Sequence, residues 1–285
     1  MQARIIVGGW HPALHRLEVQ TLLEAAGVES EVEHPRVLRV DSDDLDVDIV
    51  GRCSSITRWL LGGGRVDHMD TEALLDTILA APGPAPPESD DRQQSIAVRV
   101  ENIDGGGVGI SHSTLILELG ARLATMGWAF DLQAPDYEFV VVCVGEEQAQ
   151  HPEIEQLPRE AHILWGLSQP ADSTSIPWQE RTGPMRPFFK PVGLDPIIAR
   201  AMVNLAHPHM PDGRLALADP LCGTGGLLIE AALLGVHSFG SDLDEEMVEG
   251  TQRNLDWLWN EQDELAAVTT EVDDALDFTL DEPVP

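Results

Sequence analysis

The stretch of sequence that decides the fold is Leu217-Ala-Asp-Pro-Leu-Cys-Gly-Thr-Gly-Gly226. It connects an apolar run at residues 214–218 to a second apolar run at residues 227–234, lengths that are typical of a buried strand and a short helix. Open α/β sheets bind ligands where a strand ends and the next helix begins. Glycines at this junction let the backbone approach a ligand and leave amide N–H groups directed at it. The stretch therefore predicts a ligand-binding α/β domain.

A dinucleotide is the alternative ligand that a glycine-rich turn of this kind could bind. The dinucleotide fingerprint G-x-G-x-x-G requires a third glycine where this chain has Leu228. Asp219 stands at the predicted tip of the strand, where its carboxylate would repel a pyrophosphate and attract an ammonium group. The turn therefore favours a ligand that carries an amino group.

Acidic residues also follow the next two predicted strands, residues 237–241 and 267–272. Asp242 ends the first of them, where a carboxylate can accept hydrogen bonds from both hydroxyl groups of a ribose. Asp274 follows the other and could accept a bond from an adenine amino group. Amine, ribose and adenine together outline S-adenosylmethionine. The alternative is an ordinary set of surface acids, because the chain has 49 acidic residues.

The region from residue 186 onward alternates helices and strands, which predicts a doubly wound parallel sheet. Residues 1–150 predict an α+β region instead, with strands at 4–7, 37–40, 95–100 and 139–144 and helices at 14–26, 49–61, 71–81 and 115–126. Ser113 is the expected N-cap of the last of these helices. Residues 151–185 are expected to be a connecting linker, in which Ile163-Leu164-Trp165 packs against another element, and the proline-rich residues 82–91 are expected to be a surface loop.

The charge is strongly acidic, with 49 acidic residues against 17 basic ones and a net charge of −32. Acidic tails and partners of basic proteins concentrate such charge in blocks, whereas here the acids are spread along the chain. A protein adapted to molar salt is the favoured interpretation, because the Debye length there falls to about 3 Å and self-repulsion is screened. The net charge therefore does not exclude a nucleic acid as partner.

Cysteine and hydropathy patterns exclude several classes of site. Cys53, Cys143 and Cys222 are far apart and form no C-x-x-C pair, which indicates a reducing compartment and argues against zinc. We expect no metal. No apolar run approaches the ~20 residues that span a bilayer, and the N-terminus has no signal-peptide pattern. A soluble, cytoplasmic and monomeric protein is expected.

Several motifs resemble those of the archaeal tRNA guanine-10 N2-methyltransferase family. They are Asp219-Pro-Leu-Cys-Gly-Thr-Gly-Gly-Leu-Leu-Ile-Glu230, Gly240-Ser-Asp-Leu-Asp244, Met247-Val-Glu-Gly-Thr251, and the preceding Arg186-Pro-Phe-Phe-Lys-Pro-Val-Gly-Leu-Asp-Pro196 with Ala199-Arg-Ala-Met-Val-Asn-Leu205. Upstream, residues 95–100 and Asp131-Leu-Gln-Ala-Pro-Asp136 resemble a THUMP domain, a tRNA-binding module behind a small ferredoxin-like domain.

The resemblance implies a class I S-adenosylmethionine-dependent enzyme with three regions. Residues 1–150 would form the ferredoxin-like and THUMP region that grips the acceptor end of tRNA, residues 151–185 the linker, and residues 186–285 the first half of a Rossmann-like methyltransferase domain. The enzyme would methylate the exocyclic N2 of guanine 10 in tRNA, which requires an extruded nucleotide.

The pattern of strand tips and the resemblance together give the candidate cofactor-binding residues, which are Pro191, Gly193, Leu194, Asp219, Cys222, Gly223, Thr224, Gly225, Asp242, Leu243, Asp274 and Ala275. The chain has few basic residues, and several of them cluster within residues 52–65 and 181–190. The candidate RNA-binding residues are therefore Arg52, Arg58, Arg99, Arg186 and Lys190, each with a solvated or ion-paired surface residue as the alternative.

The chain departs from the family in one large respect. Members carry an Asp-Pro-Pro-Tyr motif after the fourth strand, and no such motif occurs here. We therefore expect a partial sequence and name no catalytic residue. The alternatives are a non-catalytic RNA-binding module with a cofactor-type cleft, and a methyltransferase that acts on ribosomal RNA or on another tRNA position.

Overall fold

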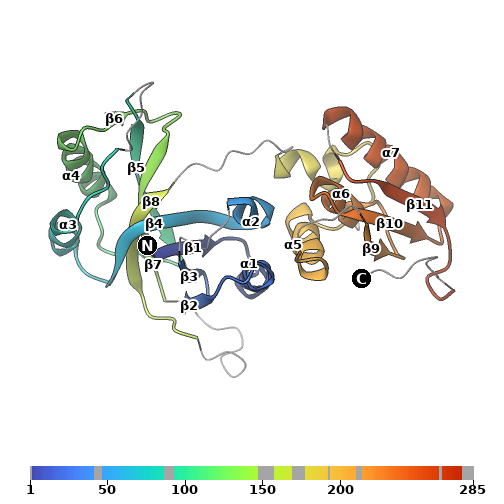
Figure 1. The fold of residues 1–285 in the computed structure, drawn as a ribbon, viewed down its shortest axis with the longest axis horizontal. Helices are drawn as coiled ribbons and strands as arrows, with labels where there is room; N and C mark the ends of the chain where they lie inside the picture. The colour runs from blue at the N-terminus through green and yellow to red at the C-terminus, as the bar shows by residue number, and fades with distance from the viewer. Residues whose placement is uncertain are drawn as a thin grey trace. The chain divides into compact units, whose positions relative to one another are not determined.

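The computed structural model describes residues 2–41, 47–86, 93–146, 157–168, 177–191, 193–209, 214–262 and 265–277. The chain divides into two compact units, each with its own sheet (Figure 1). The first unit comprises Met1–Arg16, Glu29–Leu45 and Ile56–Ala171, and the second comprises Leu17–Val28, Asp46–Ser55 and Asp172–Pro285. Among the described residues, no helix has the length and apolarity needed to cross a bilayer.

An eight-stranded mixed sheet forms the centre of the first unit, in the order β2-β3-β1-β4-β8-β7-β5-β6. β5 runs parallel to β6 and β7, and the other pairs are antiparallel. The strands are β1 (Gln2–Val7), β2 (Ser30–His34), β3 (Val37–Asp41), β4 (Ile56–Asp67), β5 (Ser95–Ile103), β6 (Ala129–Phe130), β7 (Tyr137–Val144) and β8 (His162–Ser168).

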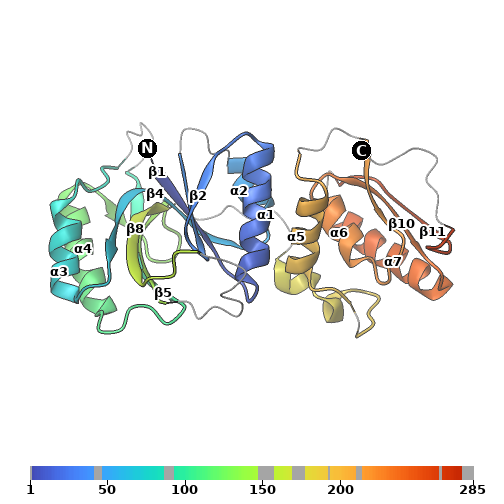
Figure 2. The same cartoon turned by 90° about the horizontal axis from the view of Figure 1, so that it is seen from below.

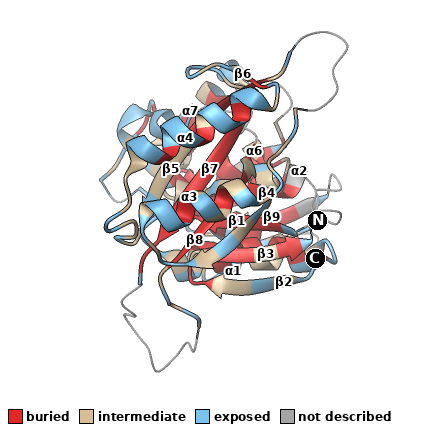
Figure 3. Cartoon of the chain, turned by 90° about the vertical axis from the view of Figure 1, so that its left-hand side faces the viewer, coloured by how far each residue is buried: buried red, intermediate tan, exposed pale blue. Residues whose placement is uncertain are grey.

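Two helices, α3 (Thr71–Ala80) and α4 (His112–Thr125), lie side by side and bury their apolar stripes in one core with residues of β5, β7 and β8 (Figure 2). The stripe on α4 is Leu115, Leu119 and Leu123, which share a face because they are spaced four residues apart. β7 is buried along its length except at Tyr137, as its near-continuous apolar sequence predicted (Figure 3). This unit confirms the expected α+β architecture.

A parallel three-stranded sheet in the order β11-β10-β9 forms the second unit, with β9 (Leu215–Asp219), β10 (His237–Asp242) and β11 (Val268–Val272). Helices α6 (Gly226–Leu233) and α7 (Glu245–Glu261) connect these strands, and α5 (Pro196–Ala206) packs against α6. The unit also contains most of α1 (Pro12–Ala25), α2 (Val47–Arg52) and the short helices Trp178–Arg181 and Gly183–Met185. The predicted β-α-β order of a Rossmann-like half-domain is confirmed.

Three expectations for the first 185 residues are wrong. The helix expected at 49–61 ends at Arg52, because residues 56–67 pair with β1 and β8 as strand β4. Residues 162–168, expected within the linker, are β8, which bonds to β4 and β7. Ser111, rather than Ser113, caps α4, because its hydroxyl accepts from the Thr114 N–H. Residues 87–91 of the expected loop and 151–156 and 169–176 of the expected linker lie outside the described residues.

Candidate ligand-binding site

The glycine turn between β9 and α6 has a backbone shape that side chains other than glycine rarely adopt. Gly223 and Gly225 have φ of 55° and 76°, in the left-handed region. A Cβ at Gly225 would lie 2.7 Å from Cγ2 of Thr251, which is part of α7. The Thr251 hydroxyl in turn donates to the Gly223 carbonyl at 2.8 Å. Thr251 of α7 therefore holds the turn in place on one side, and Gly223 lines a cavity on the other.

Asp242 ends β10 and holds the same turn from the neighbouring strand. Its Oδ2 accepts from the Gly223 N–H and its Oδ1 from the Asp244 N–H, both at 3.0 Å. The Cys222 N–H donates to the Ser241 carbonyl at 2.8 Å. Each carboxylate oxygen can accept a further bond. Asp242 can therefore position the turn and still accept bonds from the hydroxyl groups of a ligand.

Asp219 ends β9, and its partial burial makes ionisation costly. Burial raises the pKa of the Asp219 carboxyl, and the negative charge of Asp242 raises it further, while the bond that it accepts from the Leu221 N–H opposes the rise. A ligand ammonium group beside it would offset the cost by pairing with the ionised form. The position of Asp219 therefore suits an ammonium group better than a phosphate.

The two strand tips and the glycine turn surround one cavity of about 520 Å³, which lies in the size range of small-ligand pockets. The parallel register places Gly240 of β10 opposite Asp219, so both strands end at the same edge of the sheet. Of the residues predicted to bind the cofactor, those that line the cavity are Gly193, Leu194, Asp219, Cys222, Gly223, Thr224 and Asp242.

Other predicted residues do not line the cavity, namely Pro191, Gly225, Leu243, Asp274 and Ala275. Asp274 follows β11 at the same edge of the sheet, where the Asp273 N–H donates to the Asp242 carbonyl at 3.2 Å. The Oδ1 of Asp274 accepts a hydrogen bond from the Leu276 N–H at 3.0 Å. The adenine contact of Asp274 remains a prediction.

Sequence reasoning missed several residues of the cavity wall, which are Met202, Leu221, Gly226, Leu227, Asp244 and Met247. Asp244 could have been found, because an acidic residue just before a helical pattern is a typical N-cap. Its side chain accepts from the Glu246 N–H at 2.9 Å and so begins α7. No sequence pattern indicates that Met202 lines the cavity. It belongs to α5, which precedes β9 in the chain and contacts the cavity because it packs against α6.

The Cys222 thiol is part of the cavity wall but cannot act as a nucleophile at neutral pH. Burial raises its pKa to about 12, and the nearby charge of Asp219 contributes to the rise. The thiol is therefore protonated, and Cys222 contributes packing and its backbone N–H.

Asn254 of α7 connects the segment before α5 to the glycine turn, a role that the sequence did not reveal. Its side chain accepts from the Phe188 N–H at 2.8 Å and donates to the carbonyls of Phe188 and Thr224 at 2.9 and 3.0 Å. The Asn254 side chain is fully buried. It thus fixes residues near 188 beside the cavity wall at Thr224.

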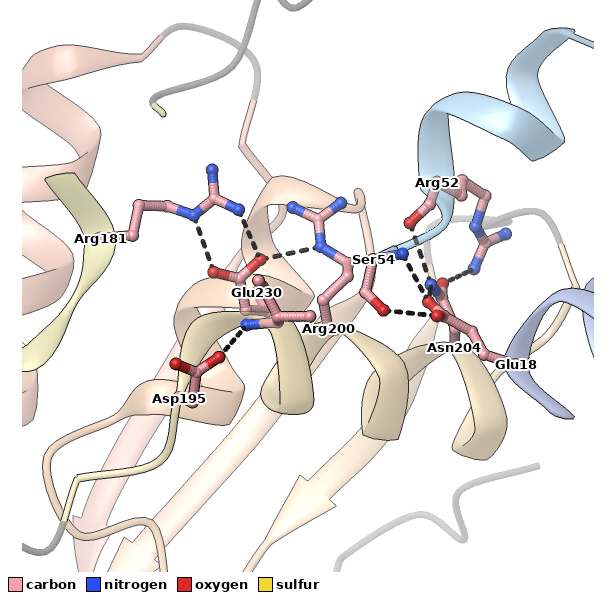
Figure 4. A network of polar contacts seen from close by, with 9 residues as sticks. Glu18, Arg52, Ser54, Arg181, Asp195, Arg200, Asn204 and Glu230 are labelled. Atoms are coloured by element: carbon pink, nitrogen blue, oxygen red, sulfur yellow. Dashed lines mark hydrogen bonds and ion pairs between the residues drawn. The ribbon is translucent and has the colours of Figure 1, made fainter. Parts of the chain in front are cut away.

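A buried cluster of arginines surrounds Glu230 of α6 (Figure 4). Glu230 Oε1 is 2.8 Å from Arg181 Nε, and its Oε2 is 2.8 Å from Arg200 Nε. Arg186 Nε donates to the Arg181 carbonyl at 2.7 Å. All four side chains are buried.

The predicted RNA contacts are wrong for Arg52 and Arg186, because both side chains are buried. Arg52 Nη1 donates to the His209 carbonyl at 2.7 Å, within the second unit. Arg58, Arg99 and Lys190 are partly exposed and form ion pairs with glutamates. Their contact with RNA is still a prediction.

Comparisons with known proteins agree with the geometry of the second unit. Residues 184–268 match a family described as UPF0020, an RMKL-like methyltransferase domain. The tRNA (guanine(10)-N2)-dimethyltransferase of Pyrococcus abyssi is 46% identical over 152 residues, which are 53% of this chain and 40% of that protein. The protein of the same name from Methanothermobacter thermautotrophicus is 46% identical over 99 residues, 35% of this chain and 27% of that protein.

The crystal structure of TrmN from Thermus thermophilus has a similar fold, with a TM-score of 0.55 over 96% of this chain and 74% of that one, at 18% identity. The chain spans less than half the length of these two curated relatives. It contains a methyltransferase domain over residues 184–268.

Proposed function

We propose that the cavity at the ends of β9 and β10 binds S-adenosylmethionine, and that the chain carries the cofactor-binding part of a tRNA guanine-N2 methyltransferase. One observation carries the proposal: Asp219, Asp242 and the Gly223 turn, which are separate in the sequence, line a single cavity. A dinucleotide would meet the partly buried carboxylate of Asp219, whereas an amino-acid ammonium group would pair with it.

The residues present fit the cofactor in charge and in size. Asp219 would hold the ammonium group and Asp242 the ribose hydroxyls, and the cavity of about 520 Å³ is large enough for a nucleoside of this kind. When bound, S-adenosylmethionine supplies a methyl group activated by its sulfonium. The contribution of this chain is to bind and orient the cofactor, and positioning of this kind supplies much of the rate enhancement of transfer reactions.

Calorimetry with S-adenosylhomocysteine in molar KCl tests the cofactor assignment. We expect Asp242→Ala to weaken binding at least about tenfold, because it removes the ribose contacts and loosens the Gly223 turn. Asp256→Asn is the matched control, since Asp256 is an exposed carboxylate of α7 outside the cavity. Equal affinities for the wild type and Asp242→Ala would reject the assignment.

The proposed acceptor is guanine 10 of tRNA, and it rests on the names of the relatives that share 46% identity with this chain. Footprinting of unmodified tRNA by the chain, with S-adenosylhomocysteine present, tests it, and a transcript in which guanine 10 is replaced is the control. Protection around guanine 10 that weakens in the control transcript supports the proposal. Protection confined to another part of the tRNA indicates another position, and equal protection of both transcripts indicates an RNA-binding module without this target.

A further inference from the structure

One face of helix α7 holds the segment just before α5. Glu246, Gly250 and Asn254 form this face, because residues four apart lie on the same side of a helix. The Asn254 side chain accepts from the Phe188 N–H and donates to the Phe188 carbonyl. Glu246 pairs with the Lys190 ammonium group at 2.7 Å. Two of the three residues thus bond directly to the segment.

Gly250 leaves the space that the Phe188 ring occupies. A Cβ at Gly250 would overlap Cδ1 and Cε1 of the ring, so any other residue would displace it. The ring is buried, and the Arg253 guanidinium group lies 5.0 Å from its centre. Alanine is a better helix former than glycine, so the fit to the ring, and not the stability of α7, accounts for a glycine at this position.

A neighbouring row of α7 contacts the glycine turn, which is another part of the cavity wall. Met247 lines the cavity, and Thr251 donates to the Gly223 carbonyl. Asn254 connects the two rows, because its amide also donates to the Thr224 carbonyl at 3.0 Å. One helix therefore holds both the glycine turn and the segment just before α5.

The segment that α7 holds leads directly into the cavity wall. The Gly193 N–H donates to the Lys190 carbonyl at 3.1 Å, so a turn connects the held residues to Gly193 and Leu194, which line the cavity. A Cβ at Gly193 would lie 3.5 Å from Oγ1 of Thr224, which shows how closely this segment approaches the glycine turn. A displacement of Phe188 would therefore move the wall.

We propose that Gly250 and Asn254 are positioning residues for the ligand of this cavity. Neither belongs to the described residues that line it, and both act through Phe188. The inference rests on the proposed function and adds residues that determine whether the wall is in place before the ligand arrives. A site formed in advance binds more tightly, because its wall need not be ordered during binding.

Gly250→Ala tests the contact with the ring. The added methyl group would displace Phe188, so we expect calorimetry in molar KCl to show S-adenosylhomocysteine binding at least about fivefold more weakly. With Phe188→Ala as the starting chain, the methyl group has no ring to displace, and the same substitution should change the affinity less than about twofold. An equal effect in both backgrounds would contradict the inference.

Gly120→Ala is the matched control for this substitution. Gly120 is a helical glycine of α4 in the first unit, and a Cβ there would make an ordinary contact, 3.9 Å from Cε1 of Phe130, so the affinity should not change. Hydrogen exchange of the Gly193 amide in the ligand-free chain measures the wall itself. We expect faster exchange in Gly250→Ala than in Gly120→Ala, and equal exchange would overturn the inference.

Asn254→Asp tests the other contact. Aspartate matches asparagine in size, but its ionised side chain has no N–H and would face the carbonyls of Phe188 and Thr224. We expect the affinity for S-adenosylhomocysteine to fall about tenfold or more. Asn260→Asp is the control, since Asn260 is an exposed residue of the same helix. Unchanged affinity in both Gly250→Ala and Asn254→Asp would overturn the inference and leave the proposed function intact, whereas absence of binding by the wild type would overturn both.

Discussion

Each unit contains an arginine–glutamate cluster, and the two clusters differ in their exposure to water. In the first unit, Arg58 and Arg99 both bind Glu138, at 3.2 and 2.7 Å, and Arg58 also binds Glu101 at 2.6 Å. Two guanidinium groups thus meet two carboxylates on the sheet. The arginines are 25% and 32% exposed, so water and salt screen the cluster.

In the second unit, the carboxylate of Glu230 binds Arg181 and Arg200 among the described residues, and all three side chains are buried. The difference teaches that burial decides how much an ion pair contributes to stability. Water and salt can replace a lost partner in the exposed cluster, whereas the buried cluster depends on the partners that it already has.

The largest expected effect is that of Glu230→Gln, which would leave Arg181 and Arg200 buried without their carboxylate. Removal of one partner of a buried ion pair costs about 3–5 kcal/mol. Amide hydrogen exchange of α6 measures this change, because protection there reports the local opening free energy. A loss below about 1 kcal/mol would show that the cluster is not as dry as its burial indicates.

A smaller effect is expected from Glu138→Gln in the first unit. Arg58 keeps Glu101 as a partner, and both arginines reach water, so the cost should be about 1 kcal/mol. Hydrogen exchange of β7 provides the measurement, and the effect should shrink as KCl is raised. A cost as large as that of Glu230→Gln, independent of salt, would remove the contrast between the clusters.

The last expected effect concerns ligand affinity instead of stability, and it is a pH dependence that only the second unit should show. Because burial raises the pKa of Asp219, its carboxyl is protonated at a higher pH than an ordinary aspartate. The ligand ammonium requires the ionised form, so affinity should weaken as the pH falls through the raised pKa, by up to about tenfold per pH unit below it. Titrations of the wild type and Asp219→Asn at several pH values check this, and the variant should show a flat profile. A flat profile in the wild type would contradict the role of Asp219.

The sequence predicted the second unit well because the signals there are local. Strand, glycine turn and helix follow one another within residues 214–234, and the parallel order of the strands brings Asp219 and Asp242 to one edge. Their proximity could therefore be predicted from their positions in the sequence alone.

The errors arose where distant segments meet. Strand β4 has glycines and charged residues that do not alternate cleanly, and its pairing with β1 and β8 decides its structure. Arg52 looked like a surface cation, yet it bonds to the carbonyl of His209, 157 residues away. The burial of Arg186 likewise depends on contacts with α6 that no local pattern encodes.

A crystal structure of the chain with S-adenosylhomocysteine tests the central claim most directly. We predict that the ligand lies beside the Gly223 turn, with its ammonium group at Asp219 and its ribose hydroxyls at Asp242. A ligand bound elsewhere, or one whose amino-acid end points into solvent, would contradict the account.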